Sequence, residues 1–252
     1  MTMKPRSGIL LLAIAIGQWT APLLPFLGLG QTIGAQARDG GIPPELPPGP
    51  FFSIWSVIFA LYLGFAVLAI MKPGHLERRL APPLILAGLA SIGWMLAAQL
   101  MGNEWLNFVV LIPLLIFAWE SSFRLHRMGG WDGTARRLLA AALTGLLSGW
   151  AVVAVSISLP RLMRILRDLE PTDQVWVSLC FCLIPAAILT WLYTRWVSRG
   201  LFYFTALGWG LAGIAINNWI RLGTHGLAIV TVLAGLYLLW HRLTHGARPA
   251  FE

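Results

Sequence analysis

Residues 51–71 read FFSIWSVIFALYLGFAVLAIM, an apolar run of 21 residues with no charged side chain. A bilayer has a hydrocarbon core about 30 Å thick, which a helix crosses in roughly 20 residues. The run is therefore long enough to span a membrane. The whole chain agrees, because 58% of its 252 residues are hydrophobic and 11% are charged. Soluble domains carry about 25% charged residues, so a soluble enzyme is excluded.

Seven other apolar runs lie between clusters of charged residues. The eight candidate spans are residues 8–28, 51–71, 82–101, 105–123, 138–159, 175–193, 201–219 and 225–240. No run shows the strict alternation of apolar and polar residues that is typical of a membrane-barrel strand. The sequence therefore predicts an all-α, multi-pass transmembrane helix bundle with about eight spans.

Basic residues are distributed unequally between the two sides of this bundle. With the N-terminus in the cytoplasm and eight crossings, 13 Lys and Arg fall in cytoplasmic segments and 5 in outside segments. Cytoplasmic loops of membrane proteins carry such an excess. We therefore expect a protein of the cell (inner) membrane with both termini in the cytoplasm. The net charge of +8 then needs no nucleic-acid partner to explain it.

The first candidate span has a second interpretation. A basic start, an apolar core and the triplet Ala35-Gln36-Ala37 are typical of a secretory signal peptide, whose cleavage would remove residues 1–37. The apolar run continues to Phe26, which is longer than the usual signal-peptide core of about 7–15 residues. We therefore keep residues 8–28 as a membrane span.

Two outside segments have distinctive compositions. Residues 30–50 are rich in glycine and proline, with Pro43-Pro44 and Pro47-Pro48 close to the second span. Proline fixes φ, so this loop is expected to be stiff and extended, either as a lid over the bundle or as a plain connection. Residues 160–173 place leucines and arginines on opposite faces of a helix. That pattern is typical of an interfacial helix lying along the lipid headgroups.

Few side chains offer catalytic or metal-binding chemistry. Nine of the ten acidic residues, Glu45 among them, fall in loops, ends or helix caps, and only Glu120 lies inside a predicted span. Arg124 follows Glu120 by four residues, so we expect an ion pair on one helix face. His241 and His245 have the spacing of a metal-binding pair, although a polar juxtamembrane face is the simpler interpretation. We expect no catalytic residue, no metal site and no required cofactor.

Aromatic residues are abundant, with 13 tryptophans among them. Six are expected at the bilayer boundary, where indole rings anchor helices. These are Trp105, Trp176, Trp191, Trp196, Trp219 and Trp240. Trp55, Phe59, Trp94 and Trp150 lie deeper in their spans. An indole inside a bundle offers a flat apolar face and one N–H donor, which suits a planar guest, but core packing is the competing interpretation.

Polar residues inside the predicted spans are few. Gln18, Gln99, Asn217 and Asn218 are among them, and hydrogen bonds between helices are expected for each. Small residues such as Gly149 are expected to let neighbouring helices approach closely.

Residues 47–59 read PPGPFFSIWSVIF. This stretch resembles the TspO/MBR family, the tryptophan-rich sensory proteins related to the translocator protein, and is most similar to its longer bacterial branch. In that family a proline-rich loop leads into a second helix with Phe and Trp at these places. Trp94 resembles the family's third-helix Trp, and Trp150 followed by Ala154 resembles its fifth-helix pattern. Ser91 stands where the family usually has Asn, which is a departure from the pattern.

The resemblance implies a five-helix bundle, often dimeric, with a pocket beneath the first loop for porphyrins, haem-like tetrapyrroles or sterols. The ligand-binding residues that it implies are Phe52, Trp55, Phe59, Trp94, Trp150 and Ala154, under a lid loop that contains Pro43, Pro44, Pro47 and Pro48. It covers residues 9–160. We therefore predict a TspO-like five-helix membrane domain at residues 1–160, followed at 161–252 by an amphipathic interfacial segment and a three-helix membrane extension.

These observations favour a protein that binds a hydrophobic planar ligand, either a tetrapyrrole or a sterol- or lipid-like molecule, for sensing or transport. Membrane lipids and this ligand are the expected partners, and the resemblance adds a homodimer. The alternative is a secondary transporter of a small solute, motivated by the eight spans, a Gly-rich seventh span and Asn217-Asn218. A membrane enzyme that modifies its bound ligand is the third hypothesis, and it lacks an evident acid and base pair.

Overall fold

The computed structural model of the protein describes residues 5–31, 41–129 and 134–244. All regular structure within these ranges is helical, as the sequence predicts. The triplet Ala35-Gln36-Ala37 and His245 lie outside the described residues, so the interpretations that rest on them stay predictions.

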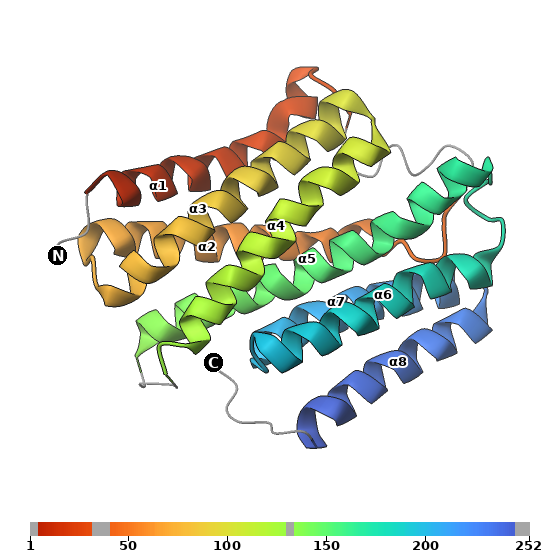
Figure 1. Ribbon diagram of the computed structural model, residues 1–252. Helices are drawn as coiled ribbons and strands as arrows, with labels where there is room; N and C mark the ends of the chain where they lie inside the picture. Colours follow the sequence, from red (N-terminus) through yellow and green to blue (C-terminus); the bar gives the residue numbers. More distant parts are fainter. Residues whose placement is uncertain (1–4, 32–40, 130–133, 245–252) are drawn as a thin grey trace.

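Long α-helices and short 3-10 or π-helical segments follow one another along the chain. They are α1 (Pro5–Thr20), η1 (Ala21–Leu27), η2 (Gly49–Ser53), α2 (Ile54–Met71), α3 (His75–Leu96), η3 (Ala97–Met101), α4 (Glu104–His126), α5 (Ala135–Arg167), α6 (Val175–Trp196), α7 (Leu201–Ile216), η4 (Asn217–Arg221) and α8 (His225–Thr244) (Figure 1). Among the described residues, seven helical segments are long and apolar enough to cross a membrane. Helix α7 has 16 residues and continues into η4 along the predicted seventh span. The chain is therefore a multi-pass membrane protein.

Helix α5 lies at the centre of the bundle and packs against α2, α4, α6 and α7 (Figure 1). Most of its 33 residues are buried, because small side chains let the neighbouring helices approach it. A Cβ on Gly149 would lie 2.3 Å from the carbonyl oxygen of Tyr203 in α7, so this contact requires glycine. Helices α1 and α3 pack on each other at one side of the bundle, and α8 lies at the opposite edge against α7.

The end of α5 differs from the sequence prediction. Residues 160–167, expected to begin an interfacial helix, continue α5 without a break. Leu162 and Arg164 are buried there, whereas Leu166 is 70% exposed. Arg161 and Arg164 pair with carboxylates from other segments, so these two arginines lie toward the protein, whereas Arg167 is exposed. An interfacial position for the segment stays a prediction.

A local prediction in α4 is confirmed, and a second agrees with the exposure of the tryptophan rings. In α4, Arg124 Nε donates a hydrogen bond to Glu120 Oε1 at 2.7 Å, as the i,i+4 spacing indicates. The six tryptophans assigned to the bilayer boundary are all exposed, as rings that face lipid should be.

Candidate functional site

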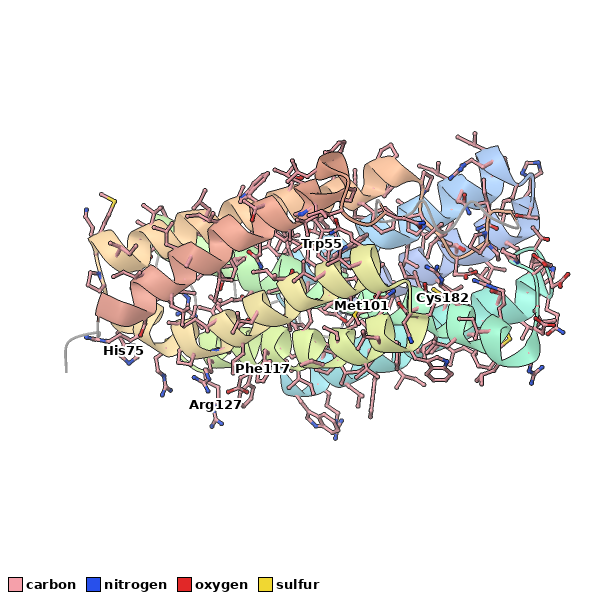
Figure 2. All side chains as sticks on the ribbon, turned by 90° about the horizontal axis from the view of Figure 1, so that it is seen from above. Trp55, His75, Met101, Phe117, Arg127 and Cys182 are labelled. Carbon is pink, nitrogen blue, oxygen red and sulfur yellow. The ribbon has the colours of Figure 1, made fainter. Side chains whose placement is uncertain are left out.

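Three tryptophans from three helices meet inside the bundle. Trp55 of α2 stacks on Trp94 of α3, with ring centroids 5.4 Å apart and planes at 27°. Trp150 of α5 meets Trp55 edge-on, at 6.5 Å and 87°. Their exposed fractions are 8%, 9% and 1%, so none of them faces the lipid. In Figure 2, Trp55 lies within the bundle, away from His75 and Arg127 at one end. The convergence predicted for these indoles is therefore present.

Two phenylalanines extend this group, which we call the aromatic cluster (Phe52, Trp55, Phe59, Trp94 and Trp150). Phe52 of η2 points its edge at Trp150, with centroids 5.9 Å apart at 86°. Phe59 lies one helical turn after Trp55 and contacts it at 5.5 Å. Such ring pairs stabilise by about 0.5–1.5 kcal/mol each beyond their area burial. The cluster is thus a continuous aromatic surface that joins α2, α3 and α5.

The structure also places two residues that bear on the predicted pocket. Trp19 of α1, which is not among the predicted ligand-binding residues, meets Phe59 with ring centroids 6.1 Å apart and is 41% exposed. The sequence of α1 alone could not have identified Trp19 as part of the site, because the ring that it contacts, Phe59, belongs to α2. Ala154 lies one turn after Trp150 on α5 and is buried, and its carbonyl oxygen accepts a hydrogen bond from Ser158 Oγ at 2.8 Å.

Several buried polar atoms of the aromatic cluster and of the helices α1, α3 and η3 have no hydrogen-bond partner among the described residues. Trp55 Nε1, Trp150 Nε1 and Ser91 Oγ are buried and unpaired. The whole side-chain amides of Gln18 and Gln99 are also buried and unpaired. Hydrogen bonds between helices, predicted for both glutamines, are therefore not found in this part of the chain. Each unpaired group costs about 1–3 kcal/mol when it is buried away from water.

Gln18 and Ser91 lie at the same level of the α1–α3 interface. Gly17 precedes Gln18 and Ile92 follows Ser91, and a Cβ on Gly17 would lie 2.8 Å from Ile92 Cδ1. This contact sets the level of Gln18 and Ser91 along the two helices. Ser91 precedes Trp94 by three residues, which places both on one face of α3. The apolar rings of the cluster are therefore accompanied by an amide and a hydroxyl that can donate and accept hydrogen bonds.

The proline-rich loop is fastened to the bundle by a buried charge. Glu45 is 1% exposed, and Arg164 of α5 donates a charged hydrogen bond to its Oε1. Ser178 Oγ of α6 donates to Glu45 Oε2 at 2.9 Å. Glu45 lies in a loop, as predicted, but it is buried and not peripheral because the loop folds inward. The signal that could have suggested the pair is the excess of arginines in residues 160–167, three against no carboxylate within that range.

Two asparagines hold the same loop from the other side. Asn217 Nδ2 donates to the Pro43 carbonyl oxygen at 3.0 Å, and Asn218 Nδ2 donates to that of Pro44 at 2.7 Å. Proline has no N–H, so its carbonyl is the only backbone group that it offers to a partner. Pro43, Pro44 and Pro47 are buried, and Pro48 is half-buried. The loop is thus packed against α5, α6 and η4, and its action as a lid stays a prediction.

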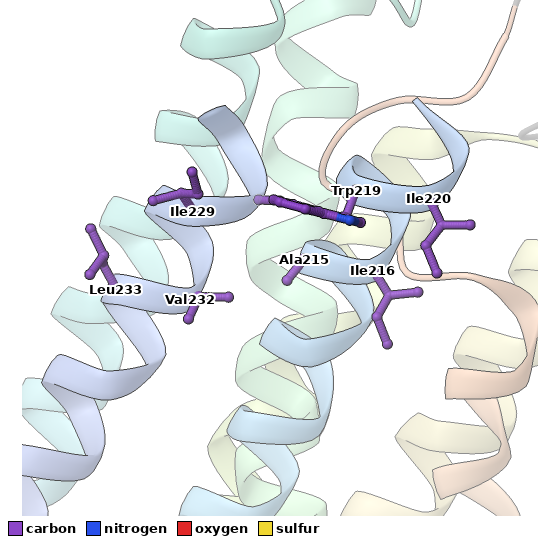
Figure 3. Close-up of a pocket in the computed structure, with 8 residues that line it drawn as sticks. Ala215, Ile216, Trp219, Ile220, Ile229, Val232 and Leu233 are labelled. Carbon is purple, nitrogen blue, oxygen red and sulfur yellow. The ribbon is translucent and has the colours of Figure 1, made fainter. Parts of the chain in front are cut away.

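An apolar groove lies away from the aromatic cluster. The groove, of about 330 Å³, runs between α7–η4 and α8 and is lined by residues that include Ile216, Trp219 and Val232 (Figure 3). Among the described residues, no group of three or more His, Cys, Asp or Glu side chains is placed to hold a metal ion.

A comparison with known families places the chain. The sequence model of a family described as TSPO-like protein matches residues 9–241. The chain belongs to the TSPO-like family. No curated protein and no solved structure matches it significantly. The match runs past residue 160, where the resemblance read from the sequence ends, so α6, α7 and most of α8 of this TSPO-like protein fall within the family's own pattern.

Contacts between the segments before and after residue 160 agree with a family match that covers both. The Glu45–Arg164–Ser178 group joins the first loop of the TSPO-like protein to α5 and α6, and Asn217 and Asn218 join that loop to η4. Trp209 Nε1 of α7 donates to the Phe51 carbonyl oxygen at 2.7 Å, immediately before the aromatic cluster begins. The C-terminal helices therefore position the segment that carries Phe52 and Trp55.

Proposed function

We propose that this TSPO-like membrane protein binds a hydrophobic planar molecule, a tetrapyrrole or a sterol- or lipid-like compound, for sensing or transport. The observation that carries the proposal is the aromatic cluster, in which indoles of α2, α3 and α5 meet in the interior. Flat apolar faces of this kind stack on flat ligands. We place the protein in the inner membrane with both termini in the cytoplasm, on the basis of its charge distribution.

The unpaired polar atoms around the cluster support a ligand that is not purely hydrocarbon. Trp55 Nε1 and Trp150 Nε1 are donors, while the amides of Gln18 and Gln99 both donate and accept. No water enters the bilayer core to satisfy such groups, so a bound molecule with polar atoms on a flat frame would stabilise them. A tetrapyrrole, with ring nitrogens and acidic side chains, has this composition.

Ring contacts within the cluster restrict how a guest can enter. Trp55 and Trp94 stack directly on each other, so a planar guest replaces this contact or lies against an outer face of the cluster. Phe52 belongs to the short helix η2, which follows the proline-rich loop, and its edge contact with Trp150 is the other contact that can open. A movement of the loop would therefore change the cluster.

Titration of the purified protein in detergent with protoporphyrin IX tests the proposal. We expect saturable tryptophan quenching and a shift of the porphyrin Soret band. Trp94→Ala and Trp150→Ala should each weaken binding by about tenfold or more, because each removes a stacking face. Trp176→Ala is the matched control, because Trp176 is 54% exposed and lies outside the cluster. Unsaturable quenching, or equal affinities of all three variants and the unmodified protein, would refute the proposal.

The transporter alternative has lost part of its motivation. Asn217 and Asn218, which suggested a solute site in the seventh span, donate hydrogen bonds to the carbonyl groups of Pro43 and Pro44. These contacts give both side chains a structural role that requires no solute.

A further inference from the structure

A basic cavity lies at the opposite end of α6 from the proline-rich loop. It has a volume of about 470 Å³ and is lined by residues of α6, of the loop that follows it and of α8. These residues are Trp191, Thr194, Arg195, Trp196, Arg199 and His241. Two arginines and a histidine thus border one cavity, and no acidic side chain is among its lining residues in the part of the chain that the structure describes. Its composition favours an anion.

Aromatic rings contact two of the basic side chains of this cavity. The guanidinium carbon of Arg195 lies 5.8 Å from the ring centroid of Trp191, and Trp191 meets Trp196 at 6.3 Å. From the α8 side, His241 stacks with Tyr237 at 6.3 Å and 20°. A guanidinium that is held over a ring presents its remaining N–H donors in a fixed fork, which matches the paired oxygens of a phosphate.

The surface next to the cavity is apolar and faces lipid. Ile184, Ile188 and Trp191 follow one another along α6 at helical spacing, with exposed fractions of 57%, 53% and 52%. This stripe leads straight to Arg195, one turn further on. The charge distribution of the sequence assigns this end of the bundle to the cytoplasm, where the leaflet contains anionic lipids. A headgroup site with an adjoining apolar stripe suits a phospholipid better than a free anion.

We propose that the cavity between the C-terminal ends of α6 and α8 binds the phosphate of an anionic phospholipid, with the acyl chains along the Ile184–Ile188–Trp191 stripe. Arg195 and Arg199 supply the positive charge, and Trp191 and Trp196 fix the depth of the headgroup. The site is separate from the aromatic cluster, so it is independent of the proposed planar ligand.

Native mass spectrometry of the full chain in detergent tests the site. The probes are phosphatidylglycerol, phosphatidylcholine with the same acyl chains, and inorganic phosphate. We expect phosphatidylglycerol to bind more tightly than phosphatidylcholine, and inorganic phosphate not to compete at equal concentration. The double variant Arg195→Gln/Arg199→Gln should lower the affinity for phosphatidylglycerol by about 25-fold, or about fivefold for each guanidinium.

The matched control removes two arginines at the same end of the bundle. Arg78 and Arg127 are exposed and lie outside the cavity, so Arg78→Gln/Arg127→Gln should leave the affinity for phosphatidylglycerol within about twofold. Equal losses in the two double variants would overturn the proposal, because they would indicate general attraction to a basic surface. Equal binding of the two lipids, or full competition by inorganic phosphate, would overturn it as well. Elution volume and far-ultraviolet circular dichroism verify that each variant is folded.

Discussion

The buried pair of Glu45 and Arg164 gives the sharpest test of how the first loop is held. The two residues are 1% and 6% exposed, and they share Ser178 as a third partner. Arg164→Met puts an apolar side chain in the same place and leaves the buried Glu45 carboxylate without its direct ion-pair partner. Removal of one partner of a buried pair costs about 3–5 kcal/mol, because the remaining charge is uncompensated.

This cost corresponds to a large shift in thermal stability. For a chain of about 250 residues, each kcal/mol lowers Tm by roughly 2–4 °C, so Arg164→Met should lower Tm by about 6–20 °C. The double variant Glu45→Gln/Arg164→Met removes both charges and should recover at least half of the loss, because no buried charge then remains. Thermal unfolding in detergent, followed by near-ultraviolet circular dichroism, measures both values.

A second ion pair in the same region is the control. Arg161 Nη2 lies 2.6 Å from Glu104 Oε1, but the Arg161 side chain is 38% exposed. Partly exposed pairs contribute about 0–1 kcal/mol, so Arg161→Met should change Tm by only a few degrees. The reasoning is refuted if Arg164→Met and Arg161→Met lower Tm equally. It is also refuted if Glu45→Gln/Arg164→Met lowers Tm by as much as Glu45→Gln and Arg164→Met together.

Two further predictions concern packing and buried polar groups. Gly149→Val should lower the free energy of unfolding by about 2 kcal/mol or more, because its side chain would collide with the Tyr203 backbone. Gly208→Ala is the control and should change little, because that position has no neighbour within 4 Å. Chemical unfolding measures the free energy of unfolding of both variants. Gln18→Leu removes a buried, unpaired amide, so it should raise the free energy of unfolding by about 1–2 kcal/mol. The same variant should weaken porphyrin binding. Unchanged stability would contradict the conclusion that this amide has no hydrogen-bond partner.

Features that depend on short stretches of chain could be predicted from the sequence. The apolar runs predict the helices, because a membrane-spanning helix is defined by its own length and composition. The Glu120–Arg124 pair is likewise local, since four residues separate the partners on one helix. Trp55, Trp94 and Trp150 required more than spacing, and their convergence was predicted from the family resemblance.

Contacts between distant segments could not be predicted in this way. Glu45 and Arg164 are 119 residues apart, and the sequence around either residue does not identify the other as its partner. Asn217 and Pro43 are 174 residues apart, and the span around Asn217 suggested a solute site instead. The basic face of residues 160–167 was assigned to the headgroups, because its carboxylates come from other segments of the chain.

The sequence by itself determined that this chain lies in a membrane as a helix bundle, and where most of its helices begin and end. Only the tertiary structure decided which side of each helix faces its neighbours. Trp150 is buried and Trp176 is 54% exposed, although both lie in apolar runs. The physical reason is that lipid tails are as apolar as a protein interior, so hydrophobicity does not separate the inner face of a membrane helix from its outer face. Close packing at small residues and pairing of buried polar groups make that choice.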